Sequence, residues 1–458
     1  MSKENLKKRS FAASAIFASA ALLLAACAPG TPAGTSSDAG EDAGATETSI
    51  AISTTLTSEP ITLTIADETG FPLTDALAEE FSKQYPNVTF NVTRDTFQNL
   101  TANAPKLLAG DNPPDLIRLP TIGDTVTDGL IANLDPWFEA YGWDKWSESQ
   151  LAPLRVNADG VRGSGNLYQL GLGYSVTGIY MNKTLASQIG LESEPQTLAE
   201  FEDALAKAKA AGILPIMAGD ADGVVNFVVQ AAMNMYADPQ EMMDWILNVP
   251  GATYETAGNI QGANLIRKWA DAGYFPSDIN AIDYGSFVTR FQEGEGLFTF
   301  NGNWAAADTQ AKMGDNVSFF LVPTVEAGGR HVAMGAANSF SVAAGSKNLD
   351  EIMYFLNWIH TDPVARQIVT DITGAAPGGD PAQEQPVVAP GSLIEKALAM
   401  SAQLGAENGQ VDFMANATAG IYAGSIIPES QLLVVSEITG EEFVTAVQKF
   451  YAEELANR

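Results

Sequence analysis

One short motif in this sequence has the residue types needed to hold a polyhydroxylated molecule. Asn301-Gly302-Asn303-Trp304 directly follows the apolar run Leu297–Phe300. An indole ring offers a flat apolar area to the C–H face of a sugar, and amide groups beside it can satisfy the sugar's hydroxyls. A lone tryptophan would predict core packing, but the flanking amides favour Asn303 and Trp304 as ligand contacts.

Other polar residues follow apolar runs of the kind that form buried strands. These candidates are Asp67, Glu68, Arg118 and Thr121 in the first part of the chain, and Asp220, Asp222 and Asn226 in the second. The spacing of Asp220 and Asp222 fits a calcium loop in part, but the other oxygen ligands of such a loop are missing. We therefore expect the loop 219–223 to lie at the mouth of a cleft.

The sequence does not indicate catalysis. His331 and His360 are not part of a Glu-x-x-His motif, no Gly-x-Ser-x-Gly elbow is present, and the single cysteine is Cys27. Glu293 and Glu295 could in principle serve a glycosidase, but carboxylates this close in a glycine-rich turn are ordinarily solvated. We predict a binding protein that is not an enzyme and that holds no metal and no cofactor.

Alternating strand and helix patterns in the first part of the chain indicate where the four candidates of that part lie. Runs of β-branched residues predict strands over 61–66, 88–92 and 116–119, and apolar residues at helical spacing predict helices over 73–85 and 97–108. This alternation predicts an α/β fold with a mostly parallel sheet covered on both faces. Ligands bind beyond the carboxyl ends of the strands in such sheets, which is where the first four candidates lie.

The segment Asn166–Lys183 predicts a hinge. Two short apolar runs, Leu167–Leu172 and Ser175–Met181, flank Gly173-Tyr174, where the glycine lets the backbone bend without a Cβ clash. A second α/β series follows. We therefore expect two lobes joined at this crossing, with a cleft beside it that includes Tyr174.

Three segments resemble the extracellular solute-binding proteins of ABC importers, of the maltose-binding type. Gly110–Leu119 (GDNPPDLIRL) and Leu130–Leu134 (LIANL) resemble the first lobe of that family, and Tyr168–Asn182 resembles its crossing segment. The similarity runs, with gaps, from Ile61 to the C-terminus. It implies the two-lobe periplasmic-binding-protein fold (type II), in which each lobe is a mainly parallel sheet flanked by helices and the lobes close over a ligand.

The resemblance also implies lobe limits and further contacts. Lobe 1 would comprise residues 61–171 plus 338–388, and lobe 2 residues 172–337 plus 389–458. The step Gly302–Trp304 resembles one that presents an aromatic ring to the ligand in this family, and Asn338 and Tyr422 would also face the cleft. The ligand would be a mono- or oligosaccharide, delivered to the permease subunits of an ABC transporter.

The first residues have the features of an export signal. Basic residues precede the apolar stretch Phe11–Leu24, which is too short to span a membrane comfortably. Leu24-Ala25-Ala26-Cys27 resembles the bacterial lipoprotein box, which implies a signal peptide over 1–26 and lipidation of Cys27, with a plain signal peptide as the alternative. Residues 27–60 predict a flexible tether. We expect an exported protein, lipid-anchored to the outer face of the cytoplasmic membrane.

Composition and charge narrow the choice of partners. The chain has 24 basic and 55 acidic residues, and removal of residues 1–26 would leave 20 against 54. Nucleic acid is a poor partner for such a negative field. With 46% hydrophobic residues the chain can bury large cores, and we expect a monomer.

Two alternatives remain open from the sequence. The same fold could bind a non-sugar solute such as a polyamine, a peptide-like molecule or an anion. Trp304 would then line the binding site without stacking against the ligand. The protein could also be a surface adhesion or sensory lipoprotein that does not serve transport.

Overall fold

The structure, a computed structural model, describes residues 52–457. The predicted signal peptide, the predicted lipidation site Cys27 and most of the predicted tether lie outside the described residues. Within residues 52–457, no helix is long and apolar enough to cross a membrane.

The sequence predicts a tether up to Pro60, but Ile52 and Leu56 pack against the adjoining hydrophobic core, and Asn87 Nδ2 donates to the carbonyl oxygen of Thr57 at 2.8 Å. The described part of this segment is therefore attached to the folded body.

Lobe 1 is built on a six-stranded sheet. Its strands, in order across the sheet, are β12 (Ala376–Pro377), β6 (Gln169–Tyr174), β11 (Ala337–Val342), β3 (Leu116–Arg118), β1 (Ile61–Glu68) and β2 (Val88–Asp95). β1 is parallel to both β2 and β3, as the strand and helix alternation predicts. β11 is antiparallel to β3 and β6 because it returns from the other lobe.

Helices cover both faces of this sheet because side chains alternate along each strand. They are α1 (Leu73–Gln84), α2 (Phe97–Leu108), α3 (Gly123–Thr127), α4 (Asp135–Phe138), α5 (Glu148–Leu151), α13 (Leu349–Thr361) and α14 (Pro363–Thr373). Leu63 and Ile65 join the core that contains α1, α13 and α14, whereas Ala66 joins the core on the side of α2. A small antiparallel hairpin of β4 (Arg155–Val156) and β5 (Asn166–Leu167) precedes β6.

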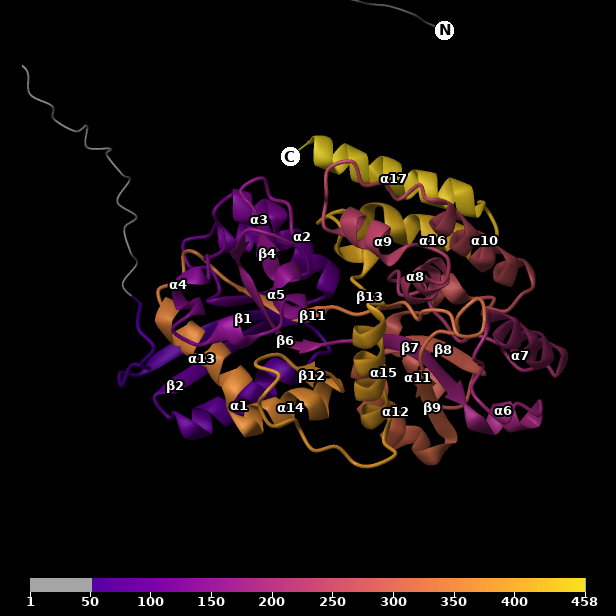
Figure 1. Ribbon diagram of the computed structural model, residues 1–458, viewed down its shortest axis with the longest axis horizontal. Helices are drawn as coiled ribbons and strands as arrows, with labels where there is room; N and C mark the ends of the chain where they lie inside the picture. Colours follow the sequence, from indigo (N-terminus) through magenta and orange to yellow (C-terminus); the bar gives the residue numbers. More distant parts are fainter. Residues whose placement is uncertain (1–51, 458) are drawn as a thin grey trace, which may run out of the picture. The chain divides into compact units, whose positions relative to one another are not determined.

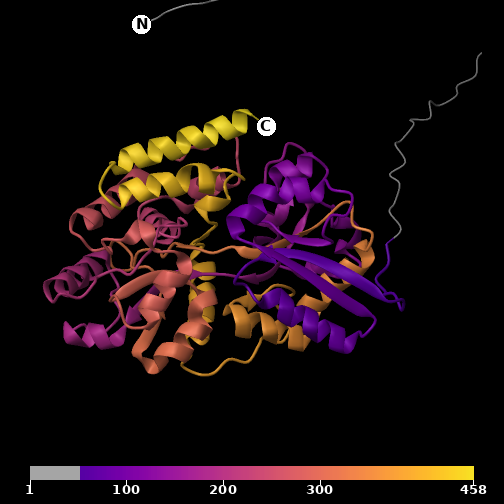
Figure 2. The same ribbon diagram turned by 180° about the vertical axis from the view of Figure 1, so that it is seen from behind.

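Lobe 2 is built on a three-stranded sheet in the order β8 (Phe298–Gly302), β7 (Thr177–Asn182), β9 (Val317–Phe320). A short parallel pair, β10 (Ala333–Met334) with β13 (Gln410–Val411), lies apart from it. The helices of lobe 2 are α6 (Lys183–Gln188), α7 (Leu198–Ala210), α8 (Asn226–Asn234), α9 (Pro239–Ile246), α10 (Ala257–Asp271), α11 (Tyr284–Gln292), α12 (Ala306–Met313), α15 (Leu393–Glu407), α16 (Ile427–Leu433) and α17 (Gly440–Ala456). Figure 1 shows the two lobes side by side, and Figure 2 shows α16 and α17 together on lobe 2.

The two-lobe α/β class is confirmed, but the mainly parallel pairing expected in each lobe is not found. Three of the five strand pairs of the lobe 1 sheet are antiparallel, and lobe 2 departs further. β7 is antiparallel to both of its neighbours. The reason is that β7 enters directly from lobe 1, so the crossing sets its direction. A parallel partner does exist for β8, but it is a single bridge between Ile216 and Phe298.

The crossing itself also differs in detail from the prediction. Gly173 lies inside β6, and the break between β6 and β7 falls at Ser175-Val176. A Cβ on Gly173 would lie 2.9 Å from Val369 Cγ1 and 3.2 Å from Ala375 Cβ. The glycine is therefore explained by the close approach of α14 to β6 and not by a bend.

We expect Gly173→Ala to lower the free energy of unfolding by about 1 to 3 kcal/mol, because buried Val369 has no room to move away. Urea denaturation of the full-length protein measures this change. Gly405→Ala is the matched control, since this helical glycine has open space around its Cβ position, and it should stabilise by about 0.5 to 1 kcal/mol. A Gly173→Ala protein as stable as the parent would contradict the packing explanation.

Candidate functional site

The turn after β8 presents Trp304 at the surface of lobe 2. β8 ends at Gly302, and a single 3₁₀ turn over Asn303–Ala305 follows. All seven tryptophans of the chain lie among residues 52–457, and Trp304 is half-buried whereas the other six are buried. Its ring lies so close over Gly302 that a Cβ there would collide with it. The Gly-x-Trp spacing thus fixes the orientation of the ring.

A chain of hydrogen bonds connects Trp304 to the polar residues of the neighbouring loop. Trp304 Nε1 donates to Tyr284 Oη at 2.8 Å, and the amide of Tyr284 donates to Asp222 Oδ2 at 3.1 Å. Tyr422 Oη donates to the carbonyl oxygen of Asp222 at 2.9 Å, and Asn226 Nδ2 donates to Tyr422 Oη at 3.2 Å. Burial raises the pKa of both the Tyr284 and the Tyr422 hydroxyls, so both remain neutral donors at physiological pH.

Three aromatic rings form an apolar wall beside these polar groups. The Trp304 ring centroid lies 5.7 Å from that of Phe227 and 6.2 Å from that of Phe413. The centroids of Phe227 and Phe413 lie 6.1 Å apart. We call these three residues the ring cluster. Such distances are typical of packed aromatic groups, and all three residues are half-buried.

The polar groups next to the ring cluster keep hydrogen-bonding capacity. Asn226 is buried, and its Oδ1 has no hydrogen-bond partner among the described residues. Asp222, in contrast, already accepts from the amide of Tyr284, and burial raises the pKa of its carboxyl while backbone hydrogen bonds oppose that rise. Buried acceptors without partners are costly unless a ligand or water supplies a donor. Asn226 Oδ1 can therefore receive a bond from a hydroxyl of a bound molecule.

Lobe 1 contributes an ion pair at the carboxyl ends of its strands. Arg118 Nη1 lies 2.7 Å from Glu68 Oε1, and the guanidinium carbon of Arg118 lies 4.3 Å from the centroid of the Phe71 ring. Burial raises the pKa of Glu68, and the charge of Arg118 opposes that rise. The negative charge of Glu68 in turn contributes to the raised pKa of Tyr284. The ion pair of lobe 1 therefore lies within electrostatic reach of the Trp304 partner in lobe 2.

The two lobes also touch directly near the site. Gln98 Nε2, at the start of α2, donates to the carbonyl oxygen of Asp222 at 3.3 Å. The ring centroid of Phe97 lies 6.5 Å from that of Tyr422. Tyr422 begins a π-helix, Tyr422–Ile426, that continues into α16, and such irregular turns are frequent at functional sites.

The structure thus brings together some of the predicted site residues. Asp222, Asn226, Trp304 and Tyr422 lie in one hydrogen-bonded group, and the charge of Glu68, which pairs with Arg118, acts on Tyr284 of this group. Five further residues contact this group and were not predicted from the sequence: Phe97, Gln98, Phe227, Tyr284 and Phe413. Phe227 directly follows the candidate Asn226, so an aromatic residue adjoining a predicted site residue was a usable signal. The others carry no local motif.

The remaining predicted residues lie in other surroundings. Asp67 is fully buried and accepts from Thr74 Oγ1 at 2.6 Å, which ties β1 to α1. Asp220 is also fully buried, and its Oδ2 accepts from Ser430 Oγ at 2.9 Å. Thr121, half-buried, follows β3.

Three of the predicted residues lie on or beside the strands that join the lobes. Tyr174 Oη donates to the carbonyl oxygen of Gln150, Asn303 Oδ1 accepts from the amide of Val176, and Asn338 is buried within β11. These bonds support the crossing between the lobes, and Asn303 Nδ2 is buried without a partner among the described residues.

Neither histidine is placed for metal binding. His360 packs against Trp146 with 4.5 Å between ring centroids, and burial lowers its pKa to about 3, so it is neutral. His331 Nδ1 lies 3.1 Å from Glu407 Oε2. Among residues 52–457, no group of three or more histidine, cysteine or acidic side chains could hold a metal ion.

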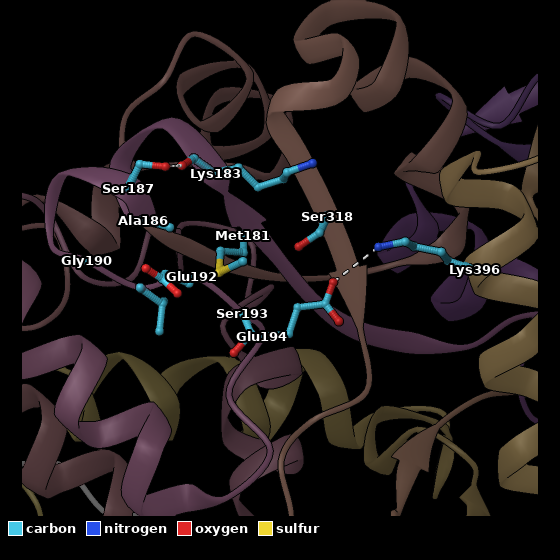
Figure 3. A pocket seen from close by; sticks show the side chains of 11 residues that line it. Met181, Lys183, Ala186, Ser187, Gly190, Glu192, Ser193, Glu194, Ser318 and Lys396 are labelled. Atoms are coloured by element: carbon cyan, nitrogen blue, oxygen red, sulfur yellow. Dashed lines mark hydrogen bonds and ion pairs between the residues drawn. The ribbon is translucent and has the colours of Figure 1, made fainter.

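A separate groove of about 530 Å³ lies on the surface of lobe 2. Figure 3 shows Lys183, Ser318, Glu194 and Lys396 around it, with the last two joined as an ion pair at 3.2 Å. None of the predicted ligand contacts lines this groove. It is therefore distinct from the group around Trp304.

The sequence of this chain is similar to known proteins. The sequence model of the family described as bacterial extracellular solute-binding protein matches residues 66–365. A multiple sugar-binding protein of Streptococcus mutans serotype c (strain ATCC 700610 / UA159) is 24% identical over 309 residues, which cover 65% of this chain and 70% of that protein.

Solved structures share the fold at low sequence identity. A chitin oligosaccharide binding protein has a TM-score of 0.71 at 19% identity, with 86% of this chain and 99% of the other covered. The galacto-N-biose-/lacto-N-biose I-binding protein of an ABC transporter from Bifidobacterium longum, in complex with lacto-N-biose, has a TM-score of 0.65 at 17% identity, with 87% and 97% covered. The two-lobe architecture of this chain is the one found in these proteins.

Proposed function

We propose, from the premise that this chain belongs to the family of bacterial extracellular solute-binding proteins, that it captures a mono- or oligosaccharide between its lobes. It would deliver the sugar to the permease of an ABC importer. The observation that carries the proposal is the half-buried Trp304 in the ring cluster, next to the unpartnered acceptor of Asn226. An apolar ring face beside hydroxyl-binding groups matches the two kinds of surface that a sugar presents.

The proposed ligand contacts come from both lobes. From lobe 2 they are Trp304, Asp222, Asn226 and Tyr422, with Tyr284 holding the indole. Glu68 and Arg118 contribute from lobe 1. The names of the similar proteins, which bind multiple sugars, chitin oligosaccharides and lacto-N-biose, support a carbohydrate as the ligand. Binding, with no change to the bonds of the sugar, is the proposed activity.

The proposal includes the cellular setting. The chain would be exported with residues 1–26 as its signal peptide, and a lipid on Cys27 would anchor it to the outer face of the cytoplasmic membrane. It would act as a monomer. Lobe 1 would comprise about 61–171 plus 338–388 and lobe 2 about 172–337 plus 389–458, although β6 and β11 extend the lobe 1 sheet to Tyr174 and Ala337. The sugar would then lie between two units that move about the segments joining them.

A thermal-shift screen tests the choice of ligand. We expect at least one of maltose, raffinose, lacto-N-biose and chitobiose to raise the melting temperature of the full-length protein, because a ligand at 100 times its Kd stabilises the native state by about 2.7 kcal/mol. Spermidine, glutamate and a tripeptide serve as comparison ligands. Stabilisation by spermidine or the peptide, with no response to any sugar, would contradict the carbohydrate proposal and favour a non-sugar solute.

A further inference from the structure

One arginine of lobe 1 is buried among groups of lobe 2. Arg162 lies in the turn between β4 and β5 of the small hairpin, yet only 4% of its surface is exposed. Its backbone amide donates to the carbonyl oxygen of Leu247 at 3.2 Å, just after α9. The turn of the hairpin is therefore docked against the end of a lobe 2 helix.

The guanidinium of Arg162 joins both lobes. Nη1 donates to the carbonyl oxygen of Pro120 in lobe 1 at 3.2 Å. Nη2 donates to the carbonyl oxygens of Asn416, at 2.7 Å, and of Ile246, both in lobe 2. The carboxylate of Asp412 lies 3.8 Å from Nη1. A buried guanidinium is stable only where several acceptors surround it, and this arrangement needs both lobes in contact.

The lobe 2 partners of Arg162 belong to the segment that carries Phe413. Asp412 Oδ1 accepts from the amide of Phe413 and from Asn416 Nδ2, both at 2.7 Å. Gln230 donates to the carbonyl oxygen of Asp412 and accepts from the amide of Met414, also at 2.7 Å. The residues that Arg162 contacts therefore frame the backbone that places the Phe413 ring against Trp304.

We propose that Arg162 is an interlobe latch that couples closure of the lobes to assembly of the ring cluster. When the lobes are in contact, its guanidinium bonds the 412–416 segment and holds Phe413 in the wall of the site. When they separate, Arg162 and Asp412 return to water and the segment loosens. Arg162 is thus a positioning residue for ligand binding, acting through Phe413 without touching the ligand.

The test compares Arg162→Met with a matched variant of the same hairpin. Arg155→Met is the control, because the side chain of Arg155 contacts Gly165, Asp135 and Glu148, all in lobe 1. Two readouts need no ligand: hydrogen exchange of the Phe413 and Met414 amides, and the radius of gyration from small-angle X-ray scattering. The full-length protein is used throughout.

We expect Arg162→Met to speed exchange of these two amides at least about tenfold and to enlarge the radius of gyration, whereas Arg155→Met changes neither. Arg162→Lys should be intermediate, since an ammonium keeps the charge but cannot span both lobes. Unchanged exchange and an unchanged radius in a folded Arg162→Met protein would overturn the latch. If Arg162→Met does not fold, Arg162→Lys takes its place, with the same two readouts.

The effect on affinity rests on the proposed function. With maltose, raffinose and lacto-N-biose as probes, Arg162→Met should raise the Kd of whichever sugar binds the parent by at least about tenfold, mainly through faster dissociation. If no sugar binds the parent, the carbohydrate proposal fails while the ligand-free readouts still decide the latch. If the parent binds and Arg162→Met binds equally well, the coupling is wrong.

Discussion

Replacing Trp304 by alanine is expected to weaken sugar binding by about 1 to 3 kcal/mol, roughly a 5- to 160-fold rise in Kd, as for aromatic residues at binding hot spots. The loss has two sources. The indole supplies the apolar face of the ring cluster, and its Nε1 bond fixes Tyr284, whose amide in turn bonds Asp222. Isothermal titration calorimetry with the sugar found in the thermal-shift screen measures the change.

Two further variants separate these sources. Trp304→Phe keeps a ring but removes the donor, and Tyr284→Phe keeps the indole but removes its acceptor. If the ring face dominates, both should retain most of the affinity that Trp304→Ala loses. An unchanged Kd in Trp304→Ala would remove this residue from the site, and the ring cluster would then be ordinary packing.

The fold of lobe 1 could be predicted closely because its signals are local. The helix expected over 97–108 is present with those bounds, and β1 is parallel to both β2 and β3, as the alternation of strands and helices predicts. What the sequence could not reveal is non-local. Gly173 reads as a bend, yet its role depends on Val369, almost two hundred residues later, and the antiparallel setting of β7 depends on which strands flank it.

The residues of the candidate site also fall into two groups: some can be predicted from local sequence patterns, and the role of others depends on tertiary contacts. Trp304, Asp222 and Asn226 are recognisable because they follow strand-like runs with the right residue types. Asp67 has the same local pattern, but its buried bond to Thr74 is a tertiary contact that no spacing predicts. Arg162 lies in a glycine-flanked turn that reads as exposed loop, and only the packing of the hairpin against α9 buries it.

Buried Asp220 predicts an unusual dependence of stability on pH. Burial raises the pKa of this carboxyl to about 8, with the hydrogen bond from Ser430 opposing the rise. In the unfolded chain its pKa returns to about 4. Between these values the folded state holds a proton that the unfolded state has lost. Its contribution to stability is therefore complete below pH 4 and is lost as pH rises towards and through 8.

Asp220→Asn mimics the protonated form at every pH, so the difference between variant and parent isolates this one group. We expect the free energy of unfolding of Asp220→Asn, relative to the parent, to rise by about 1.4 kcal/mol per pH unit, or roughly 3 kcal/mol between pH 5 and pH 7. Urea denaturation across that range measures it. Asp283→Asn is the control, because the bonds from Ser286 lower the pKa of that exposed carboxyl, and its difference from the parent should stay flat above pH 5. A flat difference for Asp220→Asn as well would mean that Asp220 is ionised in the folded protein, and the Ser430 bond would then hold a buried charge next to the loop that carries Asp222.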